Sequence, residues 1–409
     1  MTRNAIKGNL VNQTKAIWAI SGVLLAITLF YMCKKKAAPA LASATTAASG
    51  PSVAWKFQND RTTFATITLG PDGTIYAGSN QGVFAISPDG KLKWQAQYGG
   101  ISYTALGSDG MLYAASMYGL PFGVSPDGSV SWKPGYGLIG FRAPPATSTG
   151  KILYANTTSD LYAFEPGATT ALWSQNTFRG GALSPNSSLP GTATVGQNSA
   201  ASPVIYSDDS IALPRQHWVT MFGSDGTPAW SVEVTPGDLG AAALGEDGTV
   251  YTSDGGAVYA VDRDGSIGWK YPAAAGTCCV GSPATDMDGT IYFAGSRSLT
   301  ALGRDGRLKW SVSSKHAFET GPALVADGSI YIGATDGLVA FEPDGSEKWV
   351  AASPNSLTTP AISADGTAYY VCGYIWVCAV RGINSPLMKS SWPRIYHDSA
   401  NTGNILTQF

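Results

Sequence analysis

A tryptophan that recurs at nearly constant spacing constrains the fold of this chain more than any other sequence feature. Eight residues form the series, with gaps of 38 to 41 residues and one longer gap of 57: Trp55, Trp94, Trp132, Trp173, Trp230, Trp269, Trp310 and Trp349. A second marker lies in seven of the copies: Tyr76, Tyr113, Tyr154, Tyr251, Tyr292, Tyr331 and Tyr369. The remaining copy, near Ile211, is degenerate. A period of about 40 residues is typical of β-propellers, in which each repeat forms one blade.

Each repeat divides into four short strands joined by glycine-containing turns. Residues 321–350 (GPALVADGSIYIGATDGLVAFEPDGSEKWV) predict strands at 321–326, 329–333, 338–342 and 346–350. The chain contains fourteen Asp-Gly dipeptides, and this pair favours tight hairpins because both residues tolerate positive φ. The sequence therefore predicts an all-β fold with four-stranded antiparallel blades.

The two ends of the repeat region complement each other. A tryptophan strand at 52–57 precedes the first complete unit, and the last unit, 357–380, lacks its tryptophan strand. Pairing these ends completes an eighth blade and removes exposed sheet edges. We therefore expect an eight-bladed propeller over residues 51–385, followed by a tail at 386–409. A seven-bladed ring would leave one repeat outside the ring, and the eight marker tryptophans disfavour this alternative.

Residues 16–33 form an uncharged run of 18 residues, AIWAISGVLLAITLFYMC. A helix of this length spans about 27 Å, close to the hydrocarbon thickness of a bilayer. We predict a transmembrane signal-anchor helix between a basic segment (1–15) and a flexible linker (34–50). A cleaved signal peptide is disfavoured by the three lysines at 34–36, and a lipoprotein signal by the bulky residues before Cys33. Basic residues on both sides leave the orientation open.

The charge distribution excludes one class of partner. The first 50 residues carry six of the 26 basic residues and none of the 28 acidic ones, so the remainder has a net charge of −8. Nucleic-acid-binding domains carry a basic surface instead. We expect no nucleic-acid partner.

The repeat consensus DG-x-Ile-Tyr-x-Gly-Ser-x-x-Gly-x-x-x-Ala-x-x-PDG-x-x-x-Trp covers about residues 52–380. It resembles the PQQ-like repeat of the quinoprotein alcohol dehydrogenase-like superfamily, and is most similar to the non-catalytic BamB-like branch. The segment WPRIYHDSANTG at 392–403 also resembles a WP-x-x-x-HD-x-x-x-TG segment of such propellers. The fixed register of the repeated tryptophans and tyrosines within each blade predicts that they pack between neighbouring blades and do not form a sugar-binding ladder.

A pair of adjacent cysteines is the feature of this sequence that most resembles an enzyme's active site. Quinoprotein alcohol dehydrogenases place a vicinal disulfide against the quinone ring, which makes Cys278 and Cys279 candidates; the alternative is two small buried residues on a first strand. Cys372 and Cys378 flank a predicted hairpin turn, and a disulfide across it is expected in an oxidising compartment. These four cysteines permit three pairings, so the pairing stays open.

Cofactor and metal signals are weak. The family's docking motif carries Thr-Gly before its tryptophan, whereas this chain has Asp-Gly at most of these turns. The Asp-x-Asp-Gly segments at 262–265 and 286–289 lack the further oxygen ligands of a calcium loop. No histidine lies at ligand spacing to a cysteine pair. We expect neither PQQ nor calcium, and no metal site.

An insertion of about 18 residues lies in the long gap between two marker tryptophans. Loops on rigid scaffolds often carry function, so Arg179, Arg215, His217 and Trp218 form a candidate contact loop. The alternative is a tolerated surface insertion. Two tryptophans outside the repeat register, Trp376 and Trp392, are predicted to be free for binding.

Together these features favour a monomeric, membrane-tethered propeller that acts as a protein-interaction scaffold in the cell envelope, without catalytic activity. Residues 16–33 would anchor the protein in the membrane, and the propeller would be periplasmic or extracellular. Two alternatives stay open: a PQQ-dependent quinoprotein dehydrogenase, and an exported propeller that binds carbohydrate or a wall polymer.

Overall fold

The computed structural model describes residues 50–60, 62–98, 100, 102–116, 121–133, 143–148, 153–156, 160–177, 202–273, 281–399 and 401–403. The helix predicted at 16–33 and its neighbours up to residue 49 lie outside these ranges. Among the residues within them, no helix is long and apolar enough to cross a membrane. The propeller belongs to a single unit of the chain, Ser49–Phe409.

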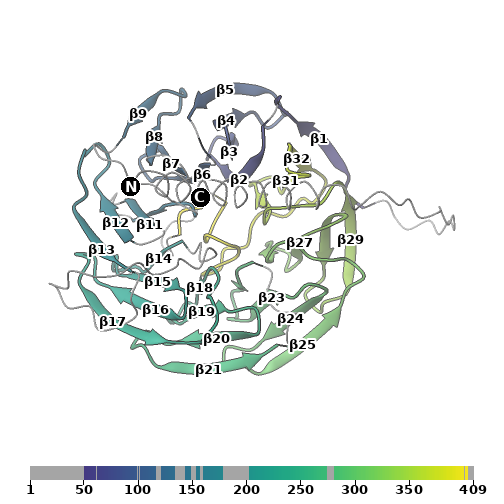
Figure 1. Ribbon diagram of the computed structural model, residues 1–409. Coiled ribbons are helices and arrows are strands. Elements are labelled where there is room, and N and C mark those ends of the chain that lie inside the picture. The colour runs from purple at the N-terminus through teal and green to yellow at the C-terminus, as the bar shows by residue number, and fades with distance from the viewer. Residues whose placement is uncertain are drawn as a thin grey trace, which may run out of the picture. The chain divides into compact units, whose positions relative to one another are not determined.

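The described residues form thirty-two strands in eight four-stranded antiparallel sheets, arranged as blades around a ring (Figure 1). From inner to outer strand, the first four blades are β2 (Phe64–Leu69), β3 (Ile75–Ser79), β4 (Gly82–Ile86) and β5 (Leu92–Gln97); β6 (Ser102–Leu106), β7 (Leu112–Ser116), β8 (Phe122–Val124) and β9 (Val130–Trp132); β10 (Ala146–Thr147), β11 (Leu153–Asn156), β12 (Asp160–Phe164) and β13 (Trp173–Asn176); β14 (Val204–Ile205), β15 (Ile211–Arg215), β16 (Trp218–Phe222) and β17 (Pro228–Glu233). The next three are β18 (Ala243–Leu244), β19 (Val250–Ser253), β20 (Ala257–Val261) and β21 (Ile267–Pro272); β22 (Ala284–Thr285), β23 (Ile291–Ala294), β24 (Ser298–Leu302) and β25 (Leu308–Ser313); β26 (Ala323–Leu324), β27 (Ile330–Ala334), β28 (Gly337–Phe341) and β29 (Glu347–Ala352). The eighth blade consists of β30 (Ala361–Ile362), β31 (Ala368–Cys372), β32 (Trp376–Val380) and β1 (Val53–Phe57).

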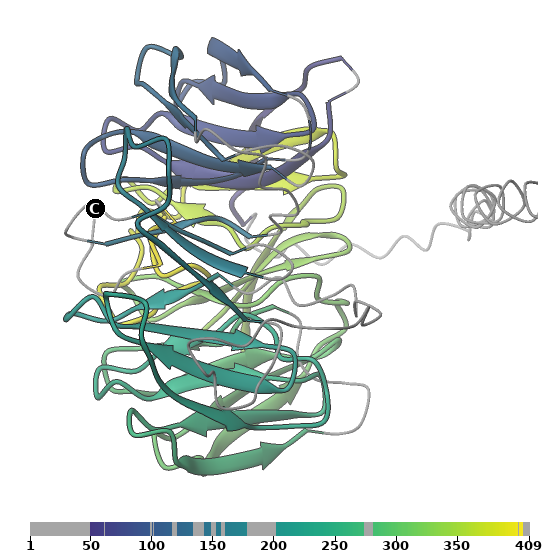
Figure 2. The ribbon, with the colours of Figure 1, turned by 60° about the vertical axis from the view of Figure 1, so that its left-hand side comes forward.

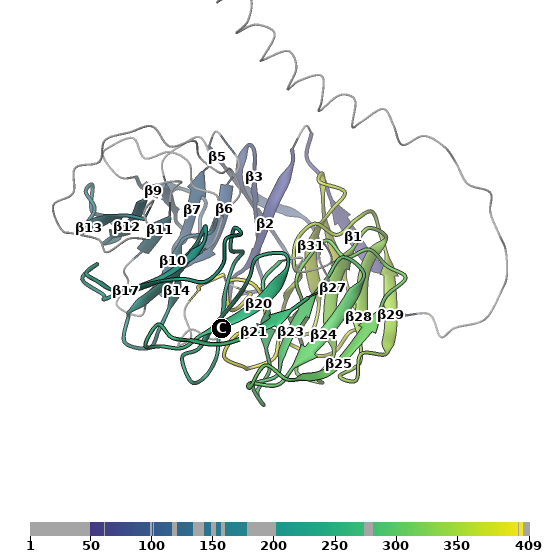
Figure 3. The same cartoon turned by 60° about the horizontal axis from the view of Figure 1, so that its bottom comes forward.

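The eighth blade is closed by the first strand of the ring. Strand β1 pairs antiparallel with β32, from Val53 opposite Val380 to Phe57 opposite Val377. Figure 3 shows β1 beside the strands of this last blade. The predicted eight-bladed architecture, closed by the strand around Trp55, is confirmed.

Each marker tryptophan joins its own blade to the next one. The Trp94 ring lies 5.8 Å from the Tyr76 ring of its own blade, and its Nε1 donates a 2.9 Å hydrogen bond to the Pro126 carbonyl of the next. A Cβ on Gly128 would lie 2.7 Å from the same indole, so glycine is required there. Five further indoles donate to a carbonyl of the following blade: Trp55, Trp132, Trp173, Trp230 and Trp269. The predicted packing between blades is confirmed.

The degenerate blade compensates for its missing tyrosine. In an ordinary blade a tyrosine pairs with a small residue, as Tyr251 does with Ala260. In the blade of β14–β17, Ala212 takes the tyrosine position and its partner across the ladder is Met221. Met221 also pairs with Trp230 on the outer strand and is buried. The larger side chain has therefore moved to the opposite strand, which keeps the interior filled.

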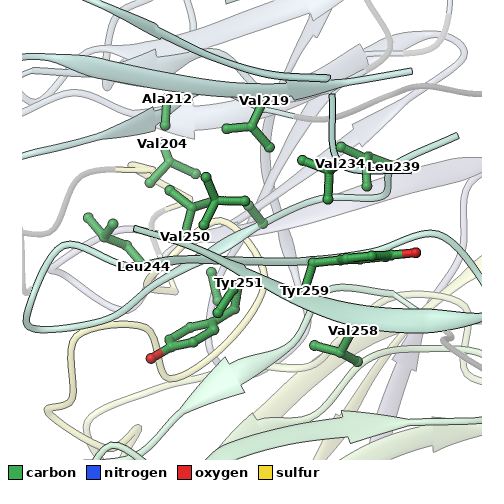
Figure 4. Close-up of a cluster of buried hydrophobic side chains, with 14 of the residues drawn as sticks. Val204, Ala212, Val219, Val234, Leu239, Leu244, Val250, Tyr251, Val258 and Tyr259 are labelled. Atoms are coloured by element: carbon green, nitrogen blue, oxygen red, sulfur yellow. The ribbon is translucent and has the colours of Figure 1, made fainter. Parts of the chain in front are cut away.

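The core lies between neighbouring blades. Inner and middle strands are buried on both faces, as in β27 and β28, because a blade packs against each side. Outer strands such as β25 alternate between exposed and partly buried residues. Figure 4 shows Val204 and Val219 of one blade gathered with Leu244 and Val250 of the next. This packing of sheet on sheet supplies the hydrophobic stabilisation of the ring.

Six of the inner strands are only two residues long, which is shorter than the sequence predicts for the strand at 321–326. The strand expected at 321–326 forms a ladder only over Ala323–Leu324. The backbone N–H groups of Leu324 and Ala326 instead donate to the carbonyls of Pro393 and Pro386, near the C-terminus of the chain. Carbonyl groups of residues at the ring centre therefore accept the hydrogen bonds of the backbone N–H groups on the inner edge of this blade.

Candidate functional site

Residues 386–399 and 401–403, here called the central segment, lie in the middle of the ring (Figure 1, yellow). Viewed from the side, the segment lies toward one side of the propeller (Figure 2). Inner strands of six blades donate a backbone hydrogen bond of 2.7–3.0 Å to it, from Leu69, Thr147, Ile205, Thr285, Leu324 and Ile362. These contacts satisfy N–H groups that would otherwise be unpaired at the ring centre.

The fold of the central segment explains the spacing of its sequence motif. The Asp398 carboxylate accepts hydrogen bonds from the Thr402 backbone N–H and hydroxyl, at 3.1 and 2.9 Å. The ring centroids of Trp392 and His397 lie 5.2 Å apart. Trp392 is only 1% exposed, so the prediction that it is free for binding is wrong: its indole belongs to the core that Leu244 and Val250 share.

Asn401 ties the central segment to two blades. Its side-chain amide donates to the carbonyls of Ile67 and Thr104, at 3.0 and 3.1 Å, and to the Thr68 hydroxyl at 2.8 Å. Its φ of 57° is in the left-handed region, which asparagine tolerates better than most residues. The amide oxygen accepts a 2.7 Å hydrogen bond from Arg394 Nη1. Asn401 therefore links two inner strands to a buried guanidinium.

Arg394 is 2% exposed and lies beside the ring centre. Its Nε donates to the Pro360 carbonyl at 3.1 Å, its Nη2 to the Thr359 carbonyl at 3.2 Å, and its Nη1 to the Asp398 carbonyl as well as to Asn401. Desolvation by burial lowers the pKa of Arg394 to about 10, and the nearby Asp398 carboxylate opposes the shift. The guanidinium is therefore charged at neutral pH.

A cavity of about 180 Å³ lies against this guanidinium in the ring centre. It is lined by Ala65, Thr66, Ile67, Tyr103, Gly281, Glu319, Thr320, Gly321, Leu357, Thr358, Thr359, Arg394, Ile395, Tyr396 and Asn401. A Cβ on Gly281 would lie 2.3 Å from the Gly321 nitrogen. Only glycine lets the two backbones approach this closely at the cavity wall. The cavity is our candidate functional site, since it brings a buried cation, a carboxylate and several hydroxyls together.

Arg215 of the predicted contact loop is buried between two blades rather than on the surface. Its Nη1 donates to the Asn156 amide oxygen at 3.3 Å and to the Thr177 hydroxyl, both in the preceding blade. Desolvation by burial lowers the pKa of Arg215 to about 10, and Asp160 opposes the shift. The side chain stabilises a contact between blades, which explains its departure from the predicted surface position.

The two neighbours of Arg215 in the predicted loop are more accessible. His217 Nδ1 lies 3.1 Å from the Gly237 carbonyl, and its own carbonyl accepts the Val234 N–H at 2.8 Å. Trp218 begins β16 opposite Arg215 and is partly exposed. The structure thus brings these three residues to one hairpin, while Arg179 lies outside the described residues.

The structure joins Cys372 and Cys378 by a disulfide across the hairpin of β31 and β32, with a Cα–Cα distance of 6.0 Å. Both cysteines are buried. Cys278 and Cys279 lie outside the described residues.

Sequence reasoning overlooked Arg394, Asn401 and Glu319. The only signal for the first two was the motif that contains them.

The resemblance to the quinoprotein superfamily implies a quinone cofactor with calcium, and the central cavity does not fit that pair. Pockets for cofactor-sized ligands measure about 300–1,000 Å³, whereas the central cavity measures about 180 Å³. Calcium takes six to eight oxygen ligands, and no group of three or more acidic, histidine or cysteine ligands occurs among the described residues. We therefore assign no reaction step to such a group.

Residues 215–315 and 295–380 match the sequence model of a family described as outer membrane protein assembly factor BamB. BamB from Moraxella catarrhalis has a similar structure, with 16% identity and a TM-score of 0.63 over 81% of this chain and 100% of that one. Over residues 215–380 the chain is similar to the BamB family in sequence, and its propeller is similar to BamB in fold. No curated protein sequence matches it.

Other solved structures share the fold of this BamB-like propeller. Sqt1 from Saccharomyces cerevisiae is 10% identical with a TM-score of 0.60, covering 81% of this chain and 98% of that one. A virginiamycin B lyase from Staphylococcus aureus is 11% identical with a TM-score of 0.50, covering 80% and 99%. The propeller fold is thus shared with an assembly factor and with a lyase, and it does not by itself select a function.

Proposed function

We propose that this BamB-like protein is a membrane-tethered scaffold without catalytic activity, which binds a protein partner in the cell envelope. The apolar run at 16–33 supports the tether. The disulfide between Cys372 and Cys378 supports a periplasmic or extracellular propeller, because structural disulfides persist in oxidising compartments. The BamB family match supports the scaffold role.

One observation carries the proposal: an aromatic side chain is exposed at the tip of a hairpin that a hydrogen bond and a disulfide hold in place. Tyr374 is 58% exposed at the turn between β31 and β32, with a φ of 67°. Its carbonyl accepts the Phe64 N–H at 2.9 Å, and the disulfide links the two strands. Tyrosine and tryptophan dominate binding energy at protein interfaces, and a hairpin with a pre-ordered backbone loses little entropy on binding.

Trp376 extends this surface. Its Nε1 donates a 2.9 Å hydrogen bond to Gln58 Oε1, and the Lys56 ammonium lies 5.6 Å from the ring centroid. The indole is partly exposed, in keeping with the prediction that it can take part in binding. Tyr374 and Trp376 thus present two aromatic rings from one rigid hairpin.

Site-specific photocrosslinking of the full chain in native membranes tests the scaffold role. A photoreactive phenylalanine at position 374 is expected to capture one discrete protein. The same residue at position 287 is the matched control, because Met287 is also highly exposed (67%) but lies in the turn between β22 and β23. Equal capture at both positions, or none at position 374, would contradict the proposed surface.

The compartment can be tested separately. A cysteine introduced at Met287 is expected to react with a membrane-impermeant maleimide in intact cells, above the labelling of the parent chain. Protection in intact cells and reaction only after lysis would place the propeller inside and overturn the proposed location.

Enzyme activity is tested by adding PQQ and calcium to the purified full chain. Reduction of an electron-acceptor dye would overturn the non-catalytic assignment.

A further inference from the structure

The disulfide of the eighth blade is completely buried. Cys372 on β31 and Cys378 on β32 are each 0% exposed. Disulfides form and break when a thiolate attacks a disulfide sulfur, and the exchange passes through a mixed disulfide with the reacting molecule. The closed ring leaves no access for the attacking molecule and no space for that intermediate. The bond between these two cysteines is therefore out of reach of oxidants and reductants in the complete propeller.

The alternation of side chains along β31 and β32 shows which blade covers the two sulfur atoms. Tyr369 and Val371 belong to the core shared with the first blade (β2–β5). Tyr370 and Cys372 belong instead to the core shared with the seventh blade (β26–β29), and so does Cys378. Successive residues of a strand point to opposite faces of the sheet. Both cysteines therefore face the seventh blade.

The surface that the seventh blade turns toward the disulfide is apolar and closed. It includes Tyr331 on β27, Leu338 and Ala340 on β28, and Ala351 on β29. Each of these four residues is at most 1% exposed. Burial of this surface against the eighth blade is favourable because it removes apolar area from water. The same contact therefore stabilises the ring and covers the disulfide.

The segment that connects the seventh and eighth blades also covers the hairpin. Ser356 is 0% exposed and forms an antiparallel bridge with Cys372. Its N–H donates a 2.8 Å hydrogen bond to the Ala334 carbonyl of the seventh blade, and the Gly373 N–H of the eighth blade donates to the Asn355 carbonyl at 2.9 Å. The connecting segment is thus bonded to both blades. Access to the disulfide requires the eighth blade to separate from the seventh.

We propose that Cys372 and Cys378 exchange disulfides only while the eighth blade is separated from the seventh, so that the bond forms before the ring is complete and is then sealed inside it. One cysteine thiolate attacks the disulfide of an oxidised thiol such as glutathione disulfide, and one glutathione thiolate leaves. The second cysteine thiolate attacks the resulting mixed disulfide, and the other glutathione thiolate leaves. The two cysteine thiols lose two electrons and two protons, and glutathione disulfide is reduced to two thiols.

This inference concerns the order of folding events and does not depend on a protein partner. It also gives the disulfide a place in the construction of the proposed binding surface. The two strands that present Tyr374 would be linked before the eighth blade packs, and the packing would then protect the link from reductants.

Refolding of the purified full chain tests the order of events, with glutathione disulfide as the oxidant. The reduced, unfolded chain is returned to native conditions with the oxidant present from the start, or with the oxidant added only after refolding. Alkylation of the remaining thiols and peptide mapping follow Cys372 and Cys378 separately from the other cysteines. Oxidation is expected to be at least about 100-fold slower in the second case, because only local opening exposes the thiols. Equal rates would overturn the proposal.

Reduction of the native chain is a second measurement, and it does not require the reduced chain to refold. Dithiothreitol is expected to break the bond at least about 100-fold more slowly in the native chain than in the same chain in denaturant. A native rate within about ten-fold of the rate in denaturant would overturn the proposal.

A pair of variants tests whether separation of the eighth blade controls access. Leu338→Ala weakens the surface that covers the disulfide and is expected to speed reduction of the native chain at least about ten-fold. Leu299→Ala is the matched control, because Leu299 holds the same position one blade earlier, is also 0% exposed, and belongs to the core between the sixth blade (β22–β25) and the seventh. Equal acceleration in both variants would overturn the assignment to the eighth blade. If Leu338→Ala does not fold, the reduction rate of the parent chain decides alone.

Discussion

The indole Nε1 of Trp55 donates a hydrogen bond of 3.0 Å to the Pro88 carbonyl oxygen. Trp55 belongs to the strand that completes the eighth blade, and Pro88 belongs to the blade that follows it around the ring. One side chain therefore takes part in both the completion of a blade and its contact with the next. Gly90 permits the contact, because a Cβ there would lie 2.8 Å from the indole.

Trp55→Ala is expected to lower the free energy of unfolding by about 3 kcal/mol. This is the lower end of the range for truncating a buried aromatic residue, since the Trp55 ring is partly exposed. Chemical denaturation followed by tryptophan fluorescence measures the change. Leu172→Ala, at a highly exposed position, is the control and is expected to cost less than about 0.5 kcal/mol. A similar small effect for both variants would contradict the closure argument.

Met221 fills the space that a tyrosine at position 212 would occupy, and two substitutions can restore the arrangement of the other blades. Ala212→Tyr alone is expected to overpack the blade and cost about 1–3 kcal/mol. Met221→Ala alone leaves a cavity and is expected to cost about 2–5 kcal/mol. The double variant restores the pattern of the other blades, so its cost is expected to fall well below the sum of the two. Strict additivity in a double-mutant cycle would refute the compensation.

Two glycines allow the energetic cost of a left-handed backbone to be measured apart from the cost of a steric clash. Gly110 has a φ of 79° and no atom within 4 Å of an added Cβ, whereas Gly265 has a φ of 89° and the Trp230 ring 2.9 Å from that Cβ. Gly110→Ala is expected to cost about 1–2 kcal/mol, the penalty of the left-handed conformation alone. Gly265→Ala is expected to cost more, because the indole must also move. Equal melting temperatures for the two variants would show that the tryptophan contact is unimportant.

Acid is expected to destabilise the propeller through its turns. Hydrogen bonds from Ser129, Thr227, Ser266 and Ser346, each two positions further along the chain, lower the pKa values of four turn carboxyls below 3.8: Asp127, Asp225, Asp264 and Asp344. A group with a lowered folded-state pKa stabilises the fold above its unfolded pKa, and this contribution is lost as pH falls through the folded value.

The free energy of unfolding is therefore expected to be level near neutral pH and to fall below about pH 4. Asp225→Asn keeps an oxygen acceptor but does not titrate, so this variant is expected to show a shallower decline than the parent. Denaturation curves at a series of pH values measure the slope. An identical slope in parent and variant would mean that Asp225 does not contribute to acid sensitivity.

The ring could be predicted from the sequence because its determinants are local and repeated. Trp55 and Trp349 stand at the same register of their blades, and Asp-Gly turns give each hairpin its boundaries. Repetition supplies the same information eight times, so even the blade with Ala212 in place of tyrosine could be counted. The shortened inner strands could not be predicted, because the hydrogen bonds of Leu324 and Ala326 go to residues 69 and 60 positions away.

The candidate site depends on such distant contacts. Arg394 reaches Thr359 and Pro360 from 35 and 34 positions away, and Asn401 reaches Ile67 from 334 positions away. Arg215 contacts Asn156 across 59 positions, which is why a residue beside a polar loop proved to be buried. No periodic pattern marks these pairs. Sequence similarity drew attention to the segment after the last blade, but its place in the ring centre required the structure.

The pairing of β1 with β32 also has a consequence for the order of events during synthesis. The strand that ends at Phe57 has no partner until the ribosome has added the residues up to Val380. At a synthesis rate of about 5–20 residues per second, that interval lasts on the order of tens of seconds. During this time the nascent chain presents an unpaired strand edge, and a factor that shields residues 53–57 would protect the unfinished protein from aggregation.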